Sequence, residues 1–269
     1  MSTRPVATSS SGKLMIILRK ILPIALFCAV WEAACTILKI PNYIIPAPHR
    51  VLQKLVESWQ LLYSHTLVSL AEILIGFGLA AAGALICAIA MVHSRRVEAV
   101  LEPFLVVSQV IPKVALAPLF IIWFGHGMLP KIIIAALIAF FPVLVNTVVG
   151  LRSVDGEIVE LMDSIAANKR QMFWRVRLPN SLPYIFPSLK VAALLAIVGA
   201  MVGEFVGSDK GLGYLMIVGD VNLDTDLLFA ALVVITVFGM IVYALIEHFE
   251  HQIERRYGKG GGQQHLVTV

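Results

Sequence analysis

Six long apolar runs separated by shorter polar segments set the pattern of this 269-residue chain. A transmembrane helix needs about 20 mainly apolar residues to cross about 30 Å of hydrocarbon. The runs that reach this length cover 18–38, 68–92, 102–125, 130–151, 185–207 and 227–248. The pattern predicts an all-α membrane protein of about six transmembrane helices. Its membrane domain covers 15–255, between a polar N-terminal segment, 1–14, and a polar tail, 256–269.

The composition excludes a soluble globular protein. Hydrophobic residues make up 59% of the chain and charged residues 14%, against about 45–50% and about 25% in soluble domains. The first apolar run is too long for a signal peptide, and no small-residue cleavage site follows it. We therefore expect a retained first span.

Two of the runs contain residues that interrupt an ordinary membrane helix. The run 102–125 holds Pro112, Lys113 and Pro118, and proline removes a backbone donor, so a kinked or broken helix is expected. The run 185–207 holds Glu204, which is costly in lipid and should face protein or water. Lys113 and Glu204 are both candidates for a translocation path or for the bundle interior.

Small residues recur every four positions in two runs, where they permit close helix packing. They are Gly76, Ala80, Ala84 and Ala88 in one run and Gly199, Gly203 and Gly207 in the other. These faces either pack only within the chain or also line a path or a dimer seam.

The distribution of basic residues predicts the orientation in the membrane. Of the 21 lysines and arginines, about fifteen fall on the side that carries both termini, about five on the other, and Lys113 lies within a run. Cytoplasmic segments carry the excess of basic residues. Both termini are therefore predicted to be cytoplasmic. Termini on the same side require an even number of spans, and six satisfies this.

The polar segment 152–184, between two apolar runs, has the pattern of two short helices. Four apolar residues fall at i, i+3, i+4 and i+7, one face of an amphipathic helix with carboxylates around it: Ile158, Leu161, Met162 and Ile165. A second helix should begin at Asn168, because asparagine is a good N-cap and Gln171 completes a capping box. Pro179 and Pro183 should end that helix.

Such a basic hairpin could lie among lipid headgroups, which bind basic amphipathic segments. The acidic first helix argues against this reading. A short helix with carboxylates and an apolar stripe is better suited to insertion into a groove on a protein partner.

The segment 152–184 also follows a known loop signature of Glu-Ala-Ala, a glycine and a closing Leu-Pro. Glu160 takes the glutamate position, Ala166 the glycine position and Leu178-Pro179 the closing pair, while Leu161 and Met162 replace the two alanines. The stretches Ile45-Pro46-Ala47-Pro48, Trp123-Phe124-Gly125, Gly203-Glu204-Phe205 and Gly211-Leu212-Gly213 match as well. In these residues the chain resembles the inner-membrane permease subunits of bacterial ATP-binding-cassette importers, in the branch for nitrate, taurine and alkanesulfonates.

The resemblance implies a type I importer permease fold in the bacterial inner membrane. It implies a permease homodimer, two cytoplasmic ATPase subunits, an extracytoplasmic solute-binding protein, and a coupling helix at 157–167. The residues implied to contact the ATPase are Glu160, Leu161, Ile165, Ala166, Ala167, Asn168 and Pro179.

No catalytic, metal or cofactor site is expected, nor a nucleic-acid partner. The chain has no G-x-x-x-x-G-K-[ST] phosphate loop, and its three cysteines lie in apolar runs without metal-ligand spacing. A gradient-driven carrier, with Lys113 and Glu204 as its ionisable pair, is the main rival, although no sequence repeat supports it. Sulfonates, nitrate, thiamine-precursor pyrimidines and flavins all remain possible substrates.

Overall fold

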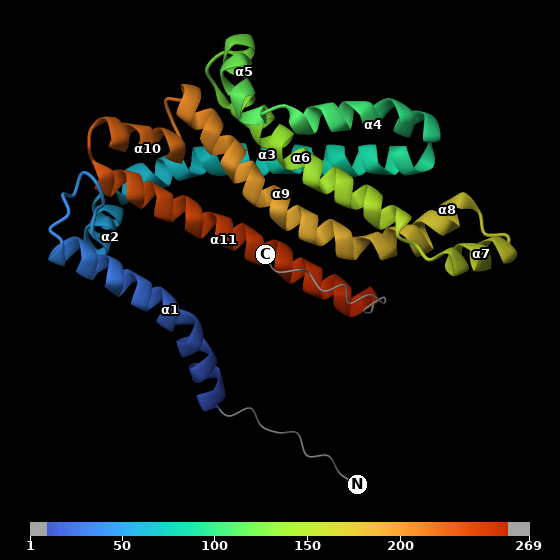
Figure 1. Ribbon diagram of the computed structural model, residues 1–269, viewed down its shortest axis with the longest axis horizontal. Coiled ribbons are helices and arrows are strands. Elements are labelled where there is room, and N and C mark those ends of the chain that lie inside the picture. Colours follow the sequence, from blue (N-terminus) through green and yellow to red (C-terminus); the bar gives the residue numbers. More distant parts are fainter. Residues whose placement is uncertain (1–9, 258–269) are drawn as a thin grey trace, which may run out of the picture.

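The computed structural model describes the backbone of residues 10–257 and the side chains of residues 22–253, and within these limits all regular structure is helical (Figure 1). The α-helices are α1 (Ser10–Ile37), α2 (Pro48–Glu57), α3 (Trp59–His93), α4 (Arg95–Val110), α5 (Ala117–Phe124), α6 (Met128–Arg152), α7 (Gly156–Ser164), α8 (Lys169–Met172), α9 (Leu178–Gly207), α10 (Leu212–Val221) and α11 (Thr225–Tyr257). A 3₁₀-helix, η1 (Lys113–Leu116), precedes α5, and a π-helical turn, η2 (Phe173–Arg177), joins α8 to α9.

Four helices in the described part of the chain are long and apolar enough to cross a membrane. They are Trp59–His93, Met128–Arg152, Lys169–Gly207 and Thr225–Ile253. Helix α4 and the η1–α5 segment together are also long and apolar enough to cross, but the chain bends by 89° between them. Counted as one broken span, they make a fifth crossing. Within α1, the apolar part whose side chains are described, Leu22–Ile37, is shorter than these helices. The bend between α4 and the η1–α5 segment confirms the interruption expected in 102–125.

Helix α6 lies at the centre of the fold, packed along α3 on one side and α9 on the other (Figure 1). Small residues set these distances. A Cβ added to Gly199 would lie 2.6 Å from the Ala135 Cα, and one added to Gly76 would lie 2.7 Å from the Ala135 Cβ. The glycines at these positions let α3 and α9 approach the α6 backbone so closely that no larger side chain would fit. Both small-residue faces therefore pack within the chain.

The helix that begins at Lys169 does not end at the prolines, which corrects the sequence prediction for Pro179 and Pro183. It continues without interruption to Gly207. A proline ring normally clashes with the carbonyl four residues earlier, which for Pro179 belongs to Arg175 in the π turn η2. The wider i→i+5 spacing of a π turn leaves more room for the ring than an α-helix does. Prolines further along, such as Pro183, are tolerated in membrane helices because neighbouring groups satisfy the freed carbonyl.

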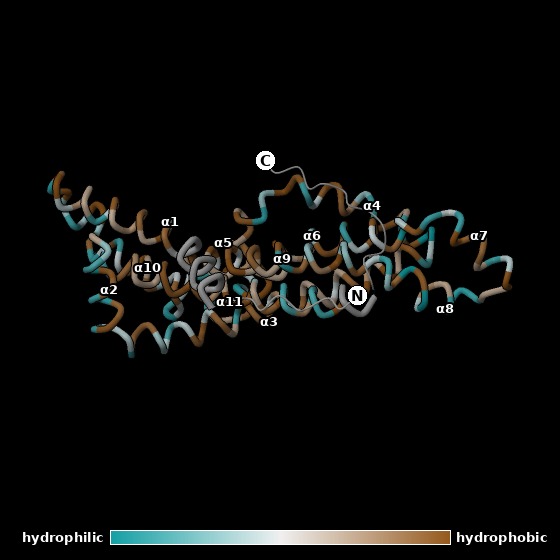
Figure 2. Tube along the Cα trace, turned by 90° about the horizontal axis from the view of Figure 1, so that it is seen from below, coloured by the Kyte–Doolittle hydropathy of each residue, from teal (hydrophilic) through white to brown (hydrophobic). Residues whose placement is uncertain are grey.

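Polar residues concentrate at the two ends of the elongated molecule. Figure 2 shows hydrophilic residues in the α7–α8 hairpin at one end and around α2 at the other, with hydrophobic residues along the helices between them. At the α2 end, Arg50 and Lys54 form ion pairs with Asp226 and Asp224, at 2.9 and 2.6 Å, and hold α2 against the start of α11.

Candidate functional site

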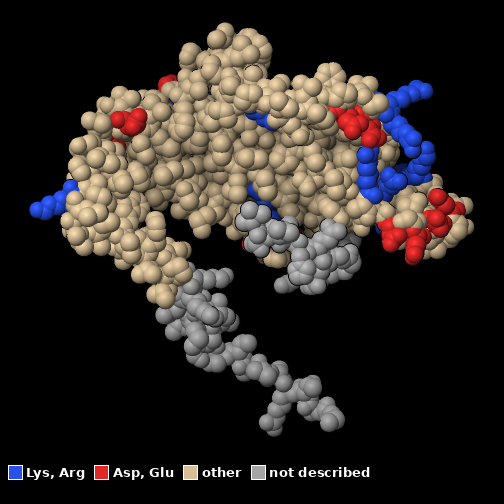
Figure 3. Space-filling model, viewed as in Figure 1, with Lys and Arg blue, Asp and Glu red and all other residues tan. Residues whose placement is uncertain are grey.

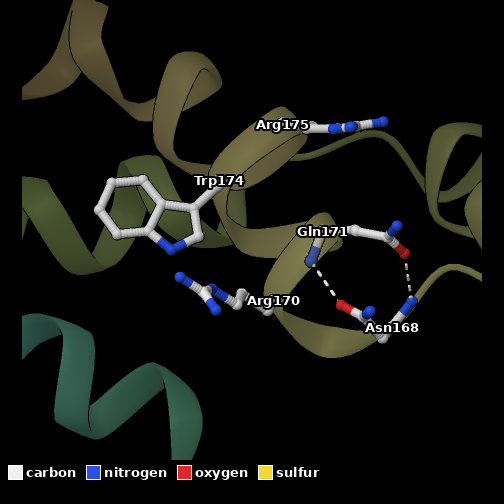
Figure 4. A pocket seen from close by; sticks show the side chains of 5 residues that line it. All are labelled: Asn168, Arg170, Gln171, Trp174 and Arg175. Atoms are coloured by element: carbon white, nitrogen blue, oxygen red, sulfur yellow. Dashed lines mark hydrogen bonds between the residues drawn. The ribbon is translucent and has the colours of Figure 1, made fainter.

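Local hydrogen bonds fix the shape of the α7–α8 hairpin. The Asp155 carboxylate caps α7 by accepting a hydrogen bond from the Glu157 backbone N–H (3.1 Å). At the start of α8, the Gln171 N–H donates to the Asn168 side chain (2.8 Å), and the Asn168 N–H donates to the Gln171 side chain (2.9 Å), as Figure 4 shows. This reciprocal pair confirms the predicted capping box.

Helix α7 ends at Ser164, three residues before the expected end of the first hairpin helix at 167. Ala166 adopts a left-handed backbone conformation (φ +53°), and the Ala167 N–H bonds back to the Met162 carbonyl (3.0 Å). Glycine adopts this conformation without steric cost, whereas alanine does not. The position therefore explains why the related loop signature has glycine there.

Ala166→Gly is expected to stabilise the hairpin by about 1 kcal/mol, because it relieves the left-handed strain of the alanine. Native-state hydrogen exchange in 156–172 should then slow by about fivefold. Ala167→Gly is the matched control, because Ala167 lacks the positive φ. Equal effects of the two substitutions would contradict this account of the turn.

The apolar stripe of α7 and its C-cap is exposed, and no other part of the described chain covers it. Leu161 and Ile165 are 61% and 66% exposed, and the helix projects from the end of the molecule (Figure 1). Figure 3 shows acidic side chains gathered at this tip, with lysines and arginines beside them. The surface of α7 thus combines exposed leucine and isoleucine with carboxylates, among them Glu160.

A cavity of about 320 Å³ opens on the neighbouring surface of the hairpin. Its lining comprises Asn168, Arg170, Gln171, Trp174 and Arg175 (Figure 4). The two arginines give it a basic lining, next to the acidic α7. The hairpin therefore offers an apolar, an acidic and a basic surface within a few turns of helix, which suits a protein partner. Pro179 lies further along, in the first turn of α9.

A second cluster of functional candidates lies at the opposite end of the bundle and is buried. The Glu204 carboxylate is 1% exposed and accepts hydrogen bonds from the Ser69 hydroxyl and the Gly213 N–H, both at 2.6 Å. The Ser69 oxygen in turn accepts from the Leu212 N–H (2.7 Å). Glu204 and Ser69 thus cap the N-terminus of α10, where unpaired N–H groups favour a negative charge.

The glycines around Glu204 make room for its carboxylate. Gly211 has φ +116°, and a Cβ there would lie 2.1 Å from a Glu204 carboxylate oxygen. A Cβ on Gly203 would lie 3.0 Å from the Lys131 Cα. These contacts explain the spacing of Gly203-Glu204 and Gly211-Leu212-Gly213. The motif builds a carboxylate-capped turn at the start of α10.

Two buried charges beside this turn were missed in the sequence. The Lys131 ammonium lies 2.5 Å from a Glu72 carboxylate oxygen, with side chains 4% and 0% exposed, and it donates to the Ser208 hydroxyl (2.8 Å). Lys131 is one of the about five basic residues that the charge count assigned to the side opposite the termini. Glu72, alone among apolar residues in a span, was the available signal, because an ionisable residue there needs a partner.

Lys113, the other sequence candidate, contacts α6 at Phe141, whereas the Glu204 cluster contacts it at Lys131, ten residues or about 15 Å along the helix. It is the first residue of η1, directly after the break in the bent span, and is partly exposed. Its ammonium lies 4.6 Å from the centroid of the Phe141 ring on α6. The structure therefore separates Lys113 and Glu204, which a gradient-driven carrier would need to bring together.

Comparison with known proteins defines the class of this chain. The family model of the binding-protein-dependent transport system inner membrane component matches residues 74–255, and the chain belongs to this family. A solved structure of the MetNI methionine transporter, in an inward-facing form, has the same fold, with a TM-score of 0.62 at 16% identity over 76% of this chain and 99% of that one. The predicted type I permease fold is thereby confirmed.

Curated relatives narrow the class to permeases of ATP-binding-cassette transporters, so the chain is a transporter subunit and not an enzyme. A riboflavin transport system permease of Chloroflexus aurantiacus is 39% identical over 87% of this chain and 89% of its own length. A probable transporter permease of Haemophilus influenzae is 38% identical over 88% and 96%. Other relatives, from Halalkalibacterium halodurans, Bacillus subtilis and Escherichia coli, are named for formylaminopyrimidine, aliphatic sulfonates and taurine, which confirms the predicted branch.

Proposed function

We propose that this chain forms the translocation path of an ATP-driven importer and works as a homodimer with two cytoplasmic ATPase subunits. A solute-binding protein delivers the solute on the opposite side, and both termini lie in the cytosol. One observation carries this proposal: the exposed apolar and acidic face of α7, in a hairpin inserted directly between the two closely packed helices α6 and α9.

The chemistry of α7 favours a protein groove over the membrane surface. Its polar face carries the carboxylates of Glu157, Glu160 and Asp163, which anionic lipid headgroups repel. Its exposed Leu161 and Ile165 fit the pattern of an amphipathic helix that docks into a hydrophobic groove. The partner is therefore a protein with an apolar groove and basic residues at its edge.

Movement of the ATPases would reach the membrane through the chain's backbone. The hairpin follows α6 after a few residues and leads into α9 without a break in the helix. When the ATPases close on nucleotide, displacement of α7 would shift α6 and α9 together, because the two backbones are in close contact at Gly199 and Ala135. The bundle would then alternate between outward-open and inward-open states.

The solute is a small organic molecule. The relatives with named cargo point to flavins, pyrimidine precursors of thiamine, and sulfonates. Selectivity in such a system rests largely on the binding protein, and the permease contributes a weaker selection along its path.

Reversal of charge at Glu160 should abolish association with the ATPase. With Glu160→Lys, alone or together with Leu161→Asp, the amount of ATPase that co-purifies with the chain should fall at least tenfold, while membrane insertion is unchanged. Glu57→Lys is the matched control, because Glu57 is exposed on α2 at the other end of the molecule. Full ATPase association in the α7 variants, or uptake driven by an ion gradient without ATP, would contradict the proposal.

A further inference from the structure

Backbone geometry at the break between α4 and η1 does not suit contact with lipid. Helix α4 ends at Val110, and Ile111 and Pro112 have extended dihedral angles before η1 begins. The end of a helix leaves carbonyl groups without intrahelical partners, and hydrocarbon offers none. Ile111, Pro112 and Val114 are exposed in the single chain. Irregular backbone at membrane depth is tolerated only against protein or water.

The break lies near the middle of the bundle along the membrane normal. The Phe141 ring, over which the Lys113 ammonium sits, belongs to α6, whose ends are Met128 and Arg152. Phe141 lies about 13 residues from the first and about 11 from the second, or roughly 20 and 16 Å at 1.5 Å per residue. An ammonium at this depth is too costly to face lipid.

Two other lysines within the described spans have acidic partners. Lys131 pairs with Glu72, and Lys190 pairs with Glu250 at 2.5 Å. The Lys113 ammonium contacts an aromatic face, which leaves its N–H groups available to a ligand. Gln109, in the last turn of α4 before the break, is also exposed.

We infer that Lys113 lines the aqueous path at mid-depth and contacts oxygen acceptor atoms of the passing solute, such as carboxylate, sulfonate or carbonyl groups. The inference rests on the proposed function, because it assigns a role within the path of that importer. The positive charge favours anionic and oxygen-rich solutes over cations, as basic residues do in anion-selective pores. In a homodimer, two such lysines would face the path.

The charge of the path can be measured without knowing the solute. Val114, exposed beside Lys113, is replaced by cysteine in a full-length chain whose Cys28, Cys35 and Cys87 are alanine. Its modification rates are compared, in reconstituted membranes, for a sulfonate-bearing and a trimethylammonium-bearing methanethiosulfonate. The anionic reagent should react faster, and Lys113→Gln should lower the ratio of the two rates by about fivefold. The ratio cancels any change in the reactivity of the thiol itself.

Glu102→Gln serves as the matched control, because it changes one charge on α4, about 11 residues from Lys113, and should alter the ratio less than twofold. Failure of both reagents to modify Val114→Cys would place the break in lipid or protein and overturn the inference. An unchanged ratio in Lys113→Gln would also overturn it. Neither result would affect ATPase association through α7, so failure here is distinct from failure of the proposed function.

Discussion

Lys131→Met is expected to lower the free energy of unfolding by about 3–5 kcal/mol, because it leaves the Glu72 carboxylate buried without its partner. A lone carboxylate in a dry interior loses most of its hydration and gains nothing in return. The loss should appear as a lower midpoint in denaturant unfolding of the detergent-solubilised chain, followed by circular dichroism.

The double variant Lys131→Met with Glu72→Gln is the control for this prediction. It removes both charges and should recover most of the lost stability, since neutral or apolar replacement of a whole buried pair is often tolerated. A single variant as stable as the wild type would show that Glu72 does not depend on Lys131. Equal loss in the single and double variants would point to packing as the cause.

Gly211→Ala should reduce stability by a similar amount, about 3–5 kcal/mol. The alanine would adopt an unfavourable φ of +116°, and its Cβ would lie 2.1 Å from the Glu204 carboxylate. The carboxylate would have to move and release its hydrogen bonds to Ser69 and Gly213, which leaves buried polar groups unpaired. The same unfolding measurement tests this expectation.

Gly125→Ala separates the two contributions. Gly125 also has a positive φ (+76°), but an added Cβ meets nothing within 4 Å. Its substitution should cost about 1–2 kcal/mol, the conformational part alone. If Gly125→Ala proved as damaging as Gly211→Ala, the contact with Glu204 would have no role in the stability of the turn.

Local patterns in the sequence predicted much of this fold. The apolar runs fall on helices, the prolines of 102–125 coincide with a real break, and Asn168 with Gln171 forms the expected capping box. Each of these features depends on residues within a few positions of one another. Periodicity and capping are therefore sufficient to predict them.

Features that depend on distant residues could not be predicted in this way. The pair Glu72–Lys131 joins α3 to α6, and Glu204 reaches Ser69 on α3, contacts that arise only when the helices pack. The prolines at 179 and 183 misled the prediction for a related reason. The π turn that precedes Pro179 has no sequence signal of its own, and it removes the steric conflict from which the helix end was inferred.

The uninterrupted helix from Lys169 to Gly207 has a mechanical consequence. Its 39 residues span about 58 Å, nearly twice the hydrocarbon thickness. A tilt of about 10° around its midpoint would displace each end by about 5 Å in opposite directions. The hairpin and the Glu204 turn thus lie near the two ends of one continuous helix. A small rotation at the hairpin end can therefore displace the cap of α10 directly, without a series of side-chain rearrangements between them.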